Sequence, residues 1–439
     1  MSTSCQIFHP ARQALMGTVQ VPGDKSITHR GILFGLLAEG TTIVEDWLDA
    51  ADCQSSLSVA RQLGAQIEVE PNRLVIQGTS GRLQEPDDVL DCGNSGTTTR
   101  MFLGALAARV PFACVNGDAS LRKRPMRRVI DPLRQMGAKI DARSGNLAPF
   151  CVTGQPLHGI SYTLPMASAQ VKSAVLIAGL LADSGSTTVV EPLPSRDHTE
   201  NMLSAFGARL TREKQEQGHV ITVESGQMLS GTTVQVPGDI SSAAFLLAAG
   251  CAVENSKITV QSIGLNPTRT GIIDVLQRMG AVIRIENQKQ VAGELIGDVT
   301  ISAQELQGIV IEPDEVPSMI DELPVAAVLA AKAKGTTVIK GAAELRVKET
   351  DRIAAVVKGL RAIGVQVEEL EDGLKVHGNG RIPGGIVDSF DDHRIAMSFA
   401  IAGLASETGV TVQNWDCVQI SYPSFLKSLE AIGVHLGAS

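Results

Sequence analysis

Residues 20–31 read QVPGDKSITHRG, and they determine how the rest of the chain is interpreted. Apolar and polar residues alternate up to the turn pair Pro22-Gly23, as in a strand that ends in a sharp turn. The aspartate or serine that follows can cap a helix. Lys25 and Arg30 then lie near a helix N-terminus, where unpaired N–H groups and the helix dipole favour an anion. The stretch predicts a phosphate or carboxylate site, although taken alone it also fits an ordinary capped helix with solvated charges.

Length and charge limit the classes of protein that the chain can belong to. It has 439 residues, enough for two or three domains, and its formal net charge is −9. Aromatic residues make up only 3% of the chain. Nucleic-acid binders are typically basic and use aromatic side chains for base stacking, so we expect no nucleic-acid partner. Small anionic substrates stay possible, because basic clusters can occur on an acidic protein.

The cysteines and the hydropathy pattern predict a location in the cytoplasm. Cysteine occurs seven times, an odd number, at wide spacing and without a C-x-x-C pair. This favours reduced thiols over a disulfide framework or a zinc site. We find no apolar run of transmembrane length and no signal-peptide core at the N-terminus, so we expect no membrane segment.

One short pattern occurs six times: a helix-like segment, an apolar residue, Gly, then Ala or Val and a strand-like alternation. Glycine after a helix adopts the left-handed cap, and the next residue starts a strand. The copies lie roughly seventy residues apart, which is the length of an α/β subdomain rather than of a solenoid unit. The glycines are Gly64, Gly137, Gly207, Gly280, Gly364 and Gly433.

A second repeat divides these six copies into two sets of three. Residues 17–24 return almost unchanged as residues 232–239, and a serine and an apolar helix follow each copy. We therefore predict two similar domains, each of three α/β units, with crossings near 22–23 and 237–238. The N-terminal domain is 23–236. Residues 1–22 precede the first crossing and should pack with 237–439 in the C-terminal domain.

Polar helix starts recur in the first half of the chain. Residues 91–100, DCGNSGTTTR, place two glycines and a capping Asn94 or Ser95 ahead of an apolar helix. Arg124 stands directly before Pro125 at a further helix entrance, and arginine suits carboxylate and phosphate forks. Ser168-Ala169-Gln170 opens another helix, and Arg196 is expected in the first turn of the next one.

The second half has its own polar helix starts. Asp321-Glu322 precedes an apolar helix, and residues 391–394, DDHR, precede another. Lys348 and Arg352 are four residues apart, so on a helix they would share a face with Glu349 beside them. A surface of ion pairs would explain several of these charges equally well.

Taken in order, these motifs resemble those of the 5-enolpyruvylshikimate-3-phosphate synthase family over nearly the whole chain, and ASAQVKSA at 167–174 resembles the second class of that family. The resemblance implies an α/β fold of two similar domains, each of three repeated βαβαββ units, known as the enolpyruvyl transferase-like inside-out α/β barrel. It implies transfer of the enolpyruvyl group from phosphoenolpyruvate to shikimate 3-phosphate in a cleft between closing domains. It also implies no metal and no cofactor, and a monomer is expected.

The resemblance also implies roles for individual residues. Asp321 is the expected base, Glu349 the expected acid, and Lys25 a further catalytic group. The residues expected to bind shikimate 3-phosphate are Lys25, Ser26, Arg30, Ser168, Ala169, Gln170, Arg196, Asp321 and Lys348. Those expected to bind phosphoenolpyruvate are Lys25, Asn94, Gly96, Arg124, Gln170, Arg352 and Arg394.

The chain departs from the family pattern at one position, and two other classes of protein are possible. In the first class of the family a lysine precedes the final Ser/Thr-aromatic-Pro motif, whereas here Ile420 stands before residues 421–423. The UDP-N-acetylglucosamine enolpyruvyl transferases share the fold, but they carry a reactive cysteine where this chain has Ala119 and an asparagine where it has Ser26. A non-enzymatic ring of six α/β repeats is the other alternative, and the acidic net charge argues against it.

Overall fold

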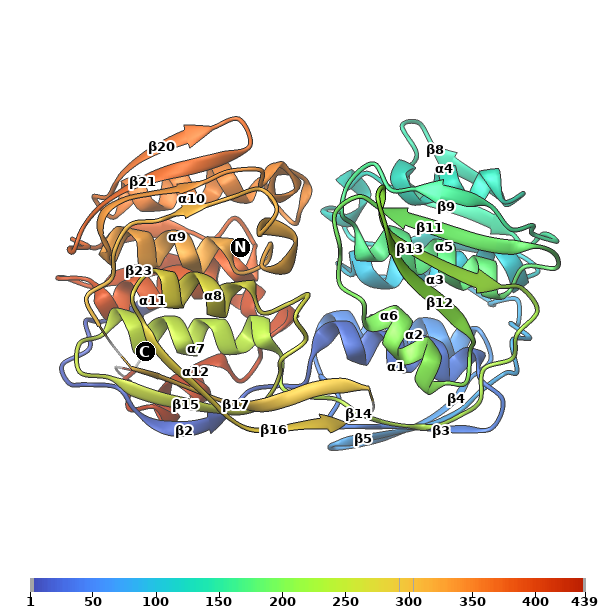
Figure 1. Cartoon of the computed structure of the whole chain (residues 1–439), viewed down its shortest axis with the longest axis horizontal. Coiled ribbons are helices and arrows are strands. Elements are labelled where there is room, and N and C mark those ends of the chain that lie inside the picture. The colour runs from blue at the N-terminus through green and yellow to red at the C-terminus, as the bar shows by residue number, and fades with distance from the viewer. Residues whose placement is uncertain (1–3, 292, 303, 437–439) are drawn as a thin grey trace. The chain divides into compact units, whose positions relative to one another are not determined.

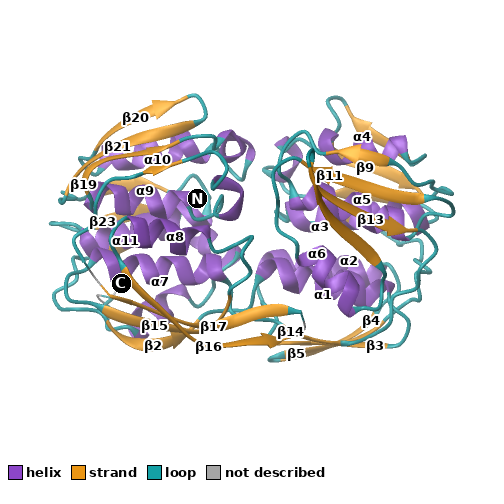
Figure 2. Cartoon of the chain, in the orientation of Figure 1, coloured by secondary structure: helices purple, strands orange, loops and turns teal. Residues whose placement is uncertain are grey.

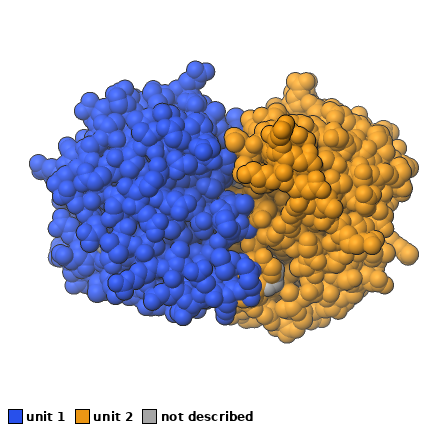
Figure 3. Space-filling view, in the orientation of Figure 1, with its two compact units in different colours: residues 1–22, 237–290, 295–439 blue, residues 23–236, 291–294 orange. Residues whose placement is uncertain are grey.

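The computed structural model describes residues 4–291, 293–302 and 304–436. Helices and strands alternate along the chain, so the predicted α/β class is confirmed (Figure 1). The chain divides into two compact units (Figure 3). Unit 1 comprises residues 1–22, 237–290 and 295–439, and unit 2 comprises residues 23–236 and 291–294. The Val-Pro-Gly motif occurs twice, and each copy contains a boundary between the units. These boundaries are 22/23 and 236/237.

Unit 2 contains three four-stranded sheets, ordered β14-β3-β5-β4, β6-β7-β9-β8 and β10-β11-β13-β12. Its strands are β3 (Thr41–Glu45), β4 (Gln66–Glu70), β5 (Arg73–Gln77), β6 (Leu90–Asp91), β7 (Ala113–Asn116), β8 (Lys139–Arg143), β9 (Leu147–Thr153), β10 (Ser161–Thr163), β11 (Ser186–Glu191), β12 (Leu210–Gln215), β13 (Gly218–Glu224) and β14 (Thr233–Gln235). Its helices are α1 (Lys25–Leu37), α2 (Ala51–Gln62), α3 (Gly96–Arg109), α4 (Arg127–Gln135), α5 (Ala169–Leu180) and α6 (His198–Ala205), with a short 3-10 turn η1 (Leu121–Lys123).

Unit 1 contains two four-stranded sheets, β16-β17-β15-β2 and β18-β19-β21-β20, and a three-stranded sheet, β1-β23-β22. Its strands are β1 (Cys5–Phe8), β2 (Met16–Gln20), β15 (Lys257–Gly264), β16 (Val282–Val291), β17 (Glu294–Ser302), β18 (Val310–Ile311), β19 (Lys334–Ile339), β20 (Gln366–Leu370), β21 (Gly373–Asn379), β22 (Gly385–Asp388) and β23 (Val410–Gln413). Its helices are α7 (Ile240–Ala252), α8 (Gly271–Arg278), α9 (Leu323–Lys332), α10 (Arg352–Ala362), α11 (His393–Ala405) and α12 (Phe425–Ala431), with 3-10 turns η2 (Val316–Ser318), η3 (Ala343–Val347) and η4 (Trp415–Ile420).

Each sheet contains one parallel strand pair, as expected of a repeated β-α-β unit. Two of these pairs join strands that are distant in the sequence. Strand β2 precedes α1 but pairs with β15 in unit 1, and β14 precedes α7 but pairs with β3 in unit 2. Each set of three repeats therefore begins with a strand in one unit and continues with a helix in the other unit.

The core of each unit is a group of helices that are buried on all sides. Helices α7, α9 and α11 contact one another in unit 1, and every residue of α7 is buried. In unit 2, helices α1, α3 and α5 (purple in Figure 2) are likewise buried along most of their length. A helix that is apolar all round is stable only when other elements cover it, and here the sheets do so. None of the helices in the described ranges is long and apolar enough to cross a membrane.

The six repeated glycines all adopt positive φ angles, between 81° and 107°. This is the left-handed cap that the pattern predicted, and it ends α2, α4, α6, α8, α10 and α12. A strand follows the first five glycines. The prediction is wrong for the sixth, because no strand follows Gly433 within the described residues up to 436.

The structure corrects three other expectations. Cys114 and Cys151 face each other across β7 and β9 and form a disulfide, so the expectation of reduced thiols is wrong for this pair. Their pairing depends on strand register, which their separation in the sequence does not reveal. Arg196 is not in the first turn of a helix, because α6 begins at His198. Lys348 does not share a helix face with Arg352, because it precedes α10 and Arg352 is the first residue of that helix.

A buried chain of hydrogen bonds joins three helices of unit 2. His29 Nδ1 on α1 lies 2.8 Å from Ser56 Oγ on α2, and Ser56 Oγ lies 2.7 Å from Thr98 Oγ1 on α3. Thr98 then donates to Ser95 Oγ over 2.7 Å. Burial lowers the pKa of His29 well below 6.5, and the neighbouring charges of Lys25 and Arg30 lower it further. The imidazole is therefore held neutral.

The lowered pKa of His29 predicts a loss of stability in acid. The unfolded chain binds a proton at His29 near pH 6.5, whereas the folded chain does not. The free energy of unfolding should therefore fall as the pH drops below that value, by up to about 1.4 kcal/mol per pH unit from this one group. Thermal unfolding midpoints measured from pH 7.5 to pH 5 should fall more steeply in the native protein than in His29→Asn.

The matched control is His9→Asn, because His9 is exposed. It should keep the native pH dependence. A His29→Asn profile parallel to the native one would contradict the assignment of a neutral buried imidazole.

Candidate active site

The first cluster of predicted residues lies at the start of α1 in unit 2. Asp24 caps this helix, since its Oδ1 accepts a hydrogen bond from the N–H of Ile27 over 2.9 Å. Lys25 Nζ donates to Asp52 Oδ2 over 3.0 Å, and the Asp52 side chain is only 8% exposed. One turn later, Arg30 Nη1 donates to the carbonyl oxygen of Ser26 over 2.9 Å. The turn therefore places two cations and a hydroxyl at a helix N-terminus, where an anion is favoured.

The second cluster surrounds the start of α3. Ser95 caps the helix by accepting a hydrogen bond from the N–H of Thr98 over 3.1 Å. Arg124 Nη2 donates to Asn94 Oδ1 over 2.6 Å, and Arg124 Nη1 donates to the Asn94 carbonyl over 3.1 Å. The amide of Asn94 in turn donates to Asp118 over 2.7 Å. Asn94 thus holds the guanidinium of Arg124 beside Gly96, the first residue of α3.

Gly96 leaves space between two guanidinium groups. A Cβ added at this position would lie 2.9 Å from Arg100 Nη1 and 3.2 Å from Arg124 Nη1. Both distances are below ordinary van der Waals contact, so a methyl group would displace the ends of these arginines. Glycine therefore lets both cations approach the start of α3.

Gln170 joins the second cluster to the start of α5. Its side-chain oxygen Oε1 accepts a hydrogen bond from Arg100 Nη1 over 2.7 Å, and its side-chain nitrogen Nε2 donates to Thr97 Oγ1 over 2.9 Å. Ser168 precedes α5 as its capping residue and Ala169 begins the helix. The structure therefore brings together the predicted residues at the starts of α3 and α5. Arg196 lies in the loop before α6.

In unit 1 the predicted residues converge on Arg352, whose side chain is 1% exposed. Its Nε donates to Asp392 Oδ2 over 2.8 Å and its Nη1 to Asp321 Oδ1 over 3.2 Å. Its Nη2 donates to Glu349 Oε2 over 2.6 Å. The buried guanidinium at the start of α10 therefore connects Asp392 before α11, Asp321 before α9 and Glu349 in the segment before α10.

Two further cations reach Asp321. Lys348 Nζ lies 4.0 Å from Asp321 Oδ1, and Arg394 Nε lies 3.8 Å from the same oxygen. Arg394 Nη1 also donates to the Asp321 carbonyl over 3.3 Å. The predicted base, the predicted acid and three predicted cations of unit 1 thus form one constellation.

This environment shifts the pKa values of two of its cations in opposite directions. Burial alone would lower the pKa of Arg352, but Asp392, Glu349 and Asp321 outweigh it and raise the pKa above its ordinary value. Desolvation lowers the pKa of Lys348 from 10.5, because Asp321 and Glu344 only partly offset it and Arg352 lowers it further. Arg352 is therefore a fixed cation, whereas Lys348 can lose its proton more readily than an ordinary lysine.

Sequence reasoning missed some residues of these clusters. Asp52 received no role, although it is the hydrogen-bond partner of Lys25, and Arg100 was quoted only as part of a motif. Nothing in the sequence links Asp52 to a lysine 27 positions earlier. Ile420, where the first class has lysine, packs against the hydrophobic core of unit 1. That position therefore contributes packing here.

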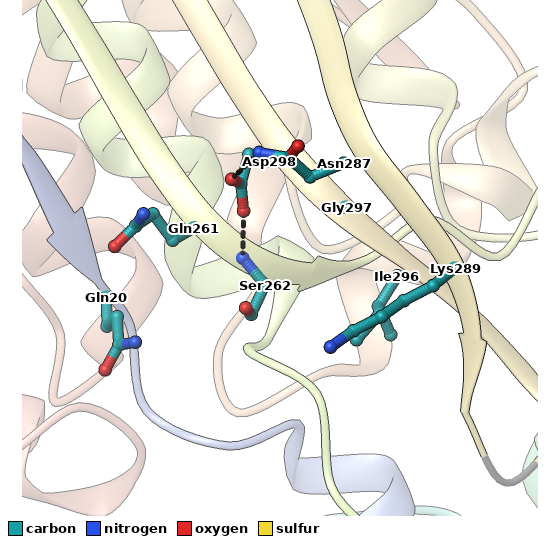
Figure 4. Close-up of a pocket in the computed structure, with 8 residues that line it drawn as sticks. All are labelled: Gln20, Gln261, Ser262, Asn287, Lys289, Ile296, Gly297 and Asp298. Atoms are coloured by element: carbon teal, nitrogen blue, oxygen red, sulfur yellow. Dashed lines mark hydrogen bonds between the residues drawn. The ribbon is translucent and has the colours of Figure 1, made fainter.

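A polar cavity of about 200 Å³ also opens in unit 1, away from these clusters (Figure 4). It lies on strands β2, β15, β16 and β17, and Asp298 Oδ1 at its edge accepts a hydrogen bond from the N–H of Ser262 over 2.8 Å. No predicted site residue lines it. The residues that line it are Gln20, Gln261, Ser262, Asn287, Lys289, Ile296, Gly297 and Asp298.

Comparisons with known proteins agree with one another over nearly the full length of the chain. The profile of the family "EPSP synthase (3-phosphoshikimate 1-carboxyvinyltransferase)" matches residues 10–429. A 3-phosphoshikimate 1-carboxyvinyltransferase from Bacillus cytotoxicus is 51% identical over 96% of this chain and 98% of its own. One from Bacillus subtilis is 49% identical, with the same coverage.

A solved structure of EPSP synthase from Acinetobacter baumannii is 43% identical and superposes with a TM-score of 0.87, covering 99% of both chains. This likeness extends through both units. Together with the constellation around Arg352 and the polar helix starts of unit 2, it establishes that the chain belongs to the EPSP synthase (3-phosphoshikimate 1-carboxyvinyltransferase) family.

Proposed function

We propose how the side chains of the two units divide the work of enolpyruvyl transfer. The reaction moves the enolpyruvyl group of phosphoenolpyruvate to the 5-hydroxyl of shikimate 3-phosphate and releases phosphate. It proceeds by addition and then elimination, so one group must accept a proton while another supplies one. The observation that carries the proposal is that Asp321 and Glu349 both pair with the buried guanidinium of Arg352. Lys348 and Arg394 in turn approach Asp321.

In the addition step, Asp321 accepts the proton of the 5-hydroxyl as the hydroxyl oxygen bonds to C2 of phosphoenolpyruvate. Glu349 donates a proton to C3, which becomes a methyl group. In the elimination step, the Glu349 carboxylate takes a proton back from C3 as phosphate leaves C2, which restores the double bond. The phosphate leaves with the proton that Asp321 had accepted. Lys25 and Lys348 stabilise the negative charge that develops on the phosphate and carboxylate oxygens.

Binding of phosphoenolpyruvate prepares the acid for this role. Glu349 accepts a hydrogen bond from Arg352 over 2.6 Å, and a charged donor at this distance favours an ionised carboxylate. An anionic group of phosphoenolpyruvate that takes this N–H releases Glu349 and favours the protonated form that the addition step needs. Arg124 and Arg394 bind the same substrate, and Asn94 and Gly96 shape the loop beside it.

The residues of α1 and α5 bind the other substrate. Lys25, Ser26, Arg30 and Gln170 surround helix starts that favour a phosphate group, and the second cluster lies beside them. Ser168, Ala169 and Arg196 complete this set. The monomeric state and the cytoplasmic location expected from the sequence stay predictions.

Phosphate release, measured separately with shikimate 3-phosphate and with UDP-N-acetylglucosamine as acceptor, tests the function itself. Release that depends on shikimate 3-phosphate is expected. Release with only the nucleotide sugar would assign the chain to the other enolpyruvyl transferases, and release with neither would contradict the proposal.

Removing either proton-transfer group should slow turnover without abolishing substrate binding. We expect Asp321→Asn and Glu349→Gln each to lower kcat by about 10²–10⁴, the usual contribution of a positioned acid or base. Steady-state kinetics and calorimetric binding of shikimate 3-phosphate measure the two effects separately. Glu369→Gln, which neutralises a carboxylate in the exposed ion pair with Arg346, is the matched control. Near-normal turnover in either variant would show that its assigned role is wrong.

The lowered pKa of Lys348 predicts an alkaline limit on activity. As the pH rises, Lys348 loses its charge below the ordinary lysine value of 10.5, and kcat/KM for phosphoenolpyruvate should fall with it. Lys348→Arg should move this decline to higher pH, because an arginine stays protonated throughout. Lys340→Arg, an exposed lysine paired with Glu312, should leave the profile unchanged. Identical alkaline limbs in the native protein and Lys348→Arg would exclude Lys348 as the titrating group.

The space at Gly96 predicts inhibition by glyphosate, which in this family competes with phosphoenolpyruvate. Glyphosate is the longer ligand, so it should depend more than phosphoenolpyruvate on the close approach of Arg100 and Arg124 to this glycine. Gly96→Ala should therefore weaken glyphosate far more than phosphoenolpyruvate. One overpacked methyl group typically costs about 1–3 kcal/mol, or roughly tenfold to a hundredfold in affinity.

The inhibition constant for glyphosate and the KM for phosphoenolpyruvate, measured in both forms, decide this prediction. Equal losses for the two ligands, or a native enzyme that glyphosate does not inhibit, would contradict it.

A further inference from the structure

A buried cluster of three charged side chains in unit 2 has no role in the mechanism given above. Lys172 lies in the first turn of α5, Glu191 ends β11, and Glu200 lies in α6. Lys172 Nζ is 2.8 Å from Glu191 Oε2 and 2.7 Å from Glu200 Oε1. The three side chains are 1%, 3% and 2% exposed. One ammonium group therefore connects three elements of the unit away from solvent.

Stability alone does not explain this cluster. Removing charges from water is expensive, and well-packed apolar residues often replace a buried ion pair with no loss of stability. Burial raises the pKa of Glu191 despite the nearby Lys172. One oxygen of Glu200, Oε2, is buried and accepts no hydrogen bond from the described residues. Such an arrangement is better explained by the geometry that it imposes.

That geometry involves the loop before α6. Ser195 Oγ donates to Glu191 Oε1 over 2.5 Å, and Lys172 Nζ lies 3.5 Å from the Ser195 carbonyl oxygen. The residue after Ser195 is Arg196, which we assign to shikimate 3-phosphate. The residues just before Lys172 on α5 include Gln170, which we assign to the same ligand. The cluster thus links two segments of the proposed binding site without being part of it.

A second junction lies one residue after Lys172 on α5 and one residue before Glu200 on α6. Ser173 Oγ on α5 is 2.6 Å from Thr199 Oγ1 on α6. Arg30 donates to both hydroxyl groups, over 3.0 Å and 2.7 Å. Adjacent residues therefore join α5 to α6 twice, once through a proposed ligand-binding arginine and once through Lys172. The buried Lys172 junction therefore lies directly next to the Arg30 junction in the sequence of both helices.

From these contacts we propose that Lys172 is a positioning residue for shikimate 3-phosphate. Through Glu191 and Glu200 it fixes the Ser195–Arg196 loop against the start of α5, so that cations from α1 and from this loop meet one phosphate group. It makes no contact with the substrate. The proposal rests on the function and the site assignment given above.

The main test replaces the cluster with apolar residues of similar size, in Lys172→Met/Glu191→Leu/Glu200→Leu. This triple variant leaves no buried charge unpaired, so it should fold with an unfolding midpoint near or above the native value. The KM and the calorimetric Kd for shikimate 3-phosphate should rise about tenfold to a hundredfold, because small displacements of positioning groups have effects of that size. The KM for phosphoenolpyruvate should change less than twofold.

Two further variants separate positioning from general damage. Glu191→Gln keeps an oxygen for Ser195 but turns a donor NH2 group toward Lys172, which stays paired with Glu200. It should therefore weaken binding of shikimate 3-phosphate less than the triple variant does. Val223→Ala removes buried volume from β13, away from the cluster, and should lower the unfolding midpoint without changing the ratio of the two KM values. If the triple variant does not fold, Lys172→Met alone, measured below its unfolding temperature, gives the same comparison.

An unchanged Kd for shikimate 3-phosphate in a folded variant that lacks Lys172 would overturn the proposal. Equal increases in both KM values would also overturn it. If the native protein itself fails to release phosphate with shikimate 3-phosphate, the proposed function fails instead, so the two failures are distinguishable.

Discussion

The hydrogen bonds of Arg352 are the interaction on which the account depends most. A guanidinium that is 1% exposed is unfavourable unless carboxylates pair with it and accept its hydrogen bonds. Here Asp392, Asp321 and Glu349 do so, and they come from three separate segments of unit 1. The requirement to pair this charge therefore brings Asp321 and Glu349, the proposed base and acid, close together. The same three contacts stabilise the buried guanidinium and hold the carboxylates in place.

The fold explains why such clusters form at helix starts. The central helices of each unit are buried on all sides, so their middle turns must be apolar. Charged residues can occur only at their ends, and the N-terminal ends supply unpaired N–H groups that favour anions. Lys25, Gln170 and Arg394 occupy this position on α1, α5 and α11 respectively. Repetition of one α/β unit therefore produces several anion-binding positions.

Much of this could be predicted from the sequence, because local signals determine it. The repeated Gly-Ala and Gly-Val pairs predicted the left-handed caps, and all six glycines have positive φ angles. The polar starts of α1, α3 and α11 followed from capping residues, whose side chains accept N–H hydrogen bonds. The proton-transfer roles of Asp321 and Glu349 came only from the resemblance to a known family.

Contacts between distant segments could not be predicted in the same way. The pairing of Lys25 with Asp52, of Cys114 with Cys151 and of Lys172 with Glu191 depends on how strands and helices pack, and no spacing in the sequence reveals it. Helix boundaries were also imprecise. Lys348 reaches Asp321 from an irregular segment before α10, where a regular helix face was expected.

The kinetics and ligand binding of Arg352→Lys test the central claim most directly. Lysine keeps the positive charge but cannot bridge three carboxylates, because its ammonium group lacks the planar fork of arginine. The account predicts that kcat/KM for phosphoenolpyruvate falls roughly a hundredfold or more, as expected when reacting groups are misplaced. Binding of shikimate 3-phosphate measured by calorimetry should persist in the same folded variant. Activity within a few-fold of native, or equal loss of both ligands, would contradict the account.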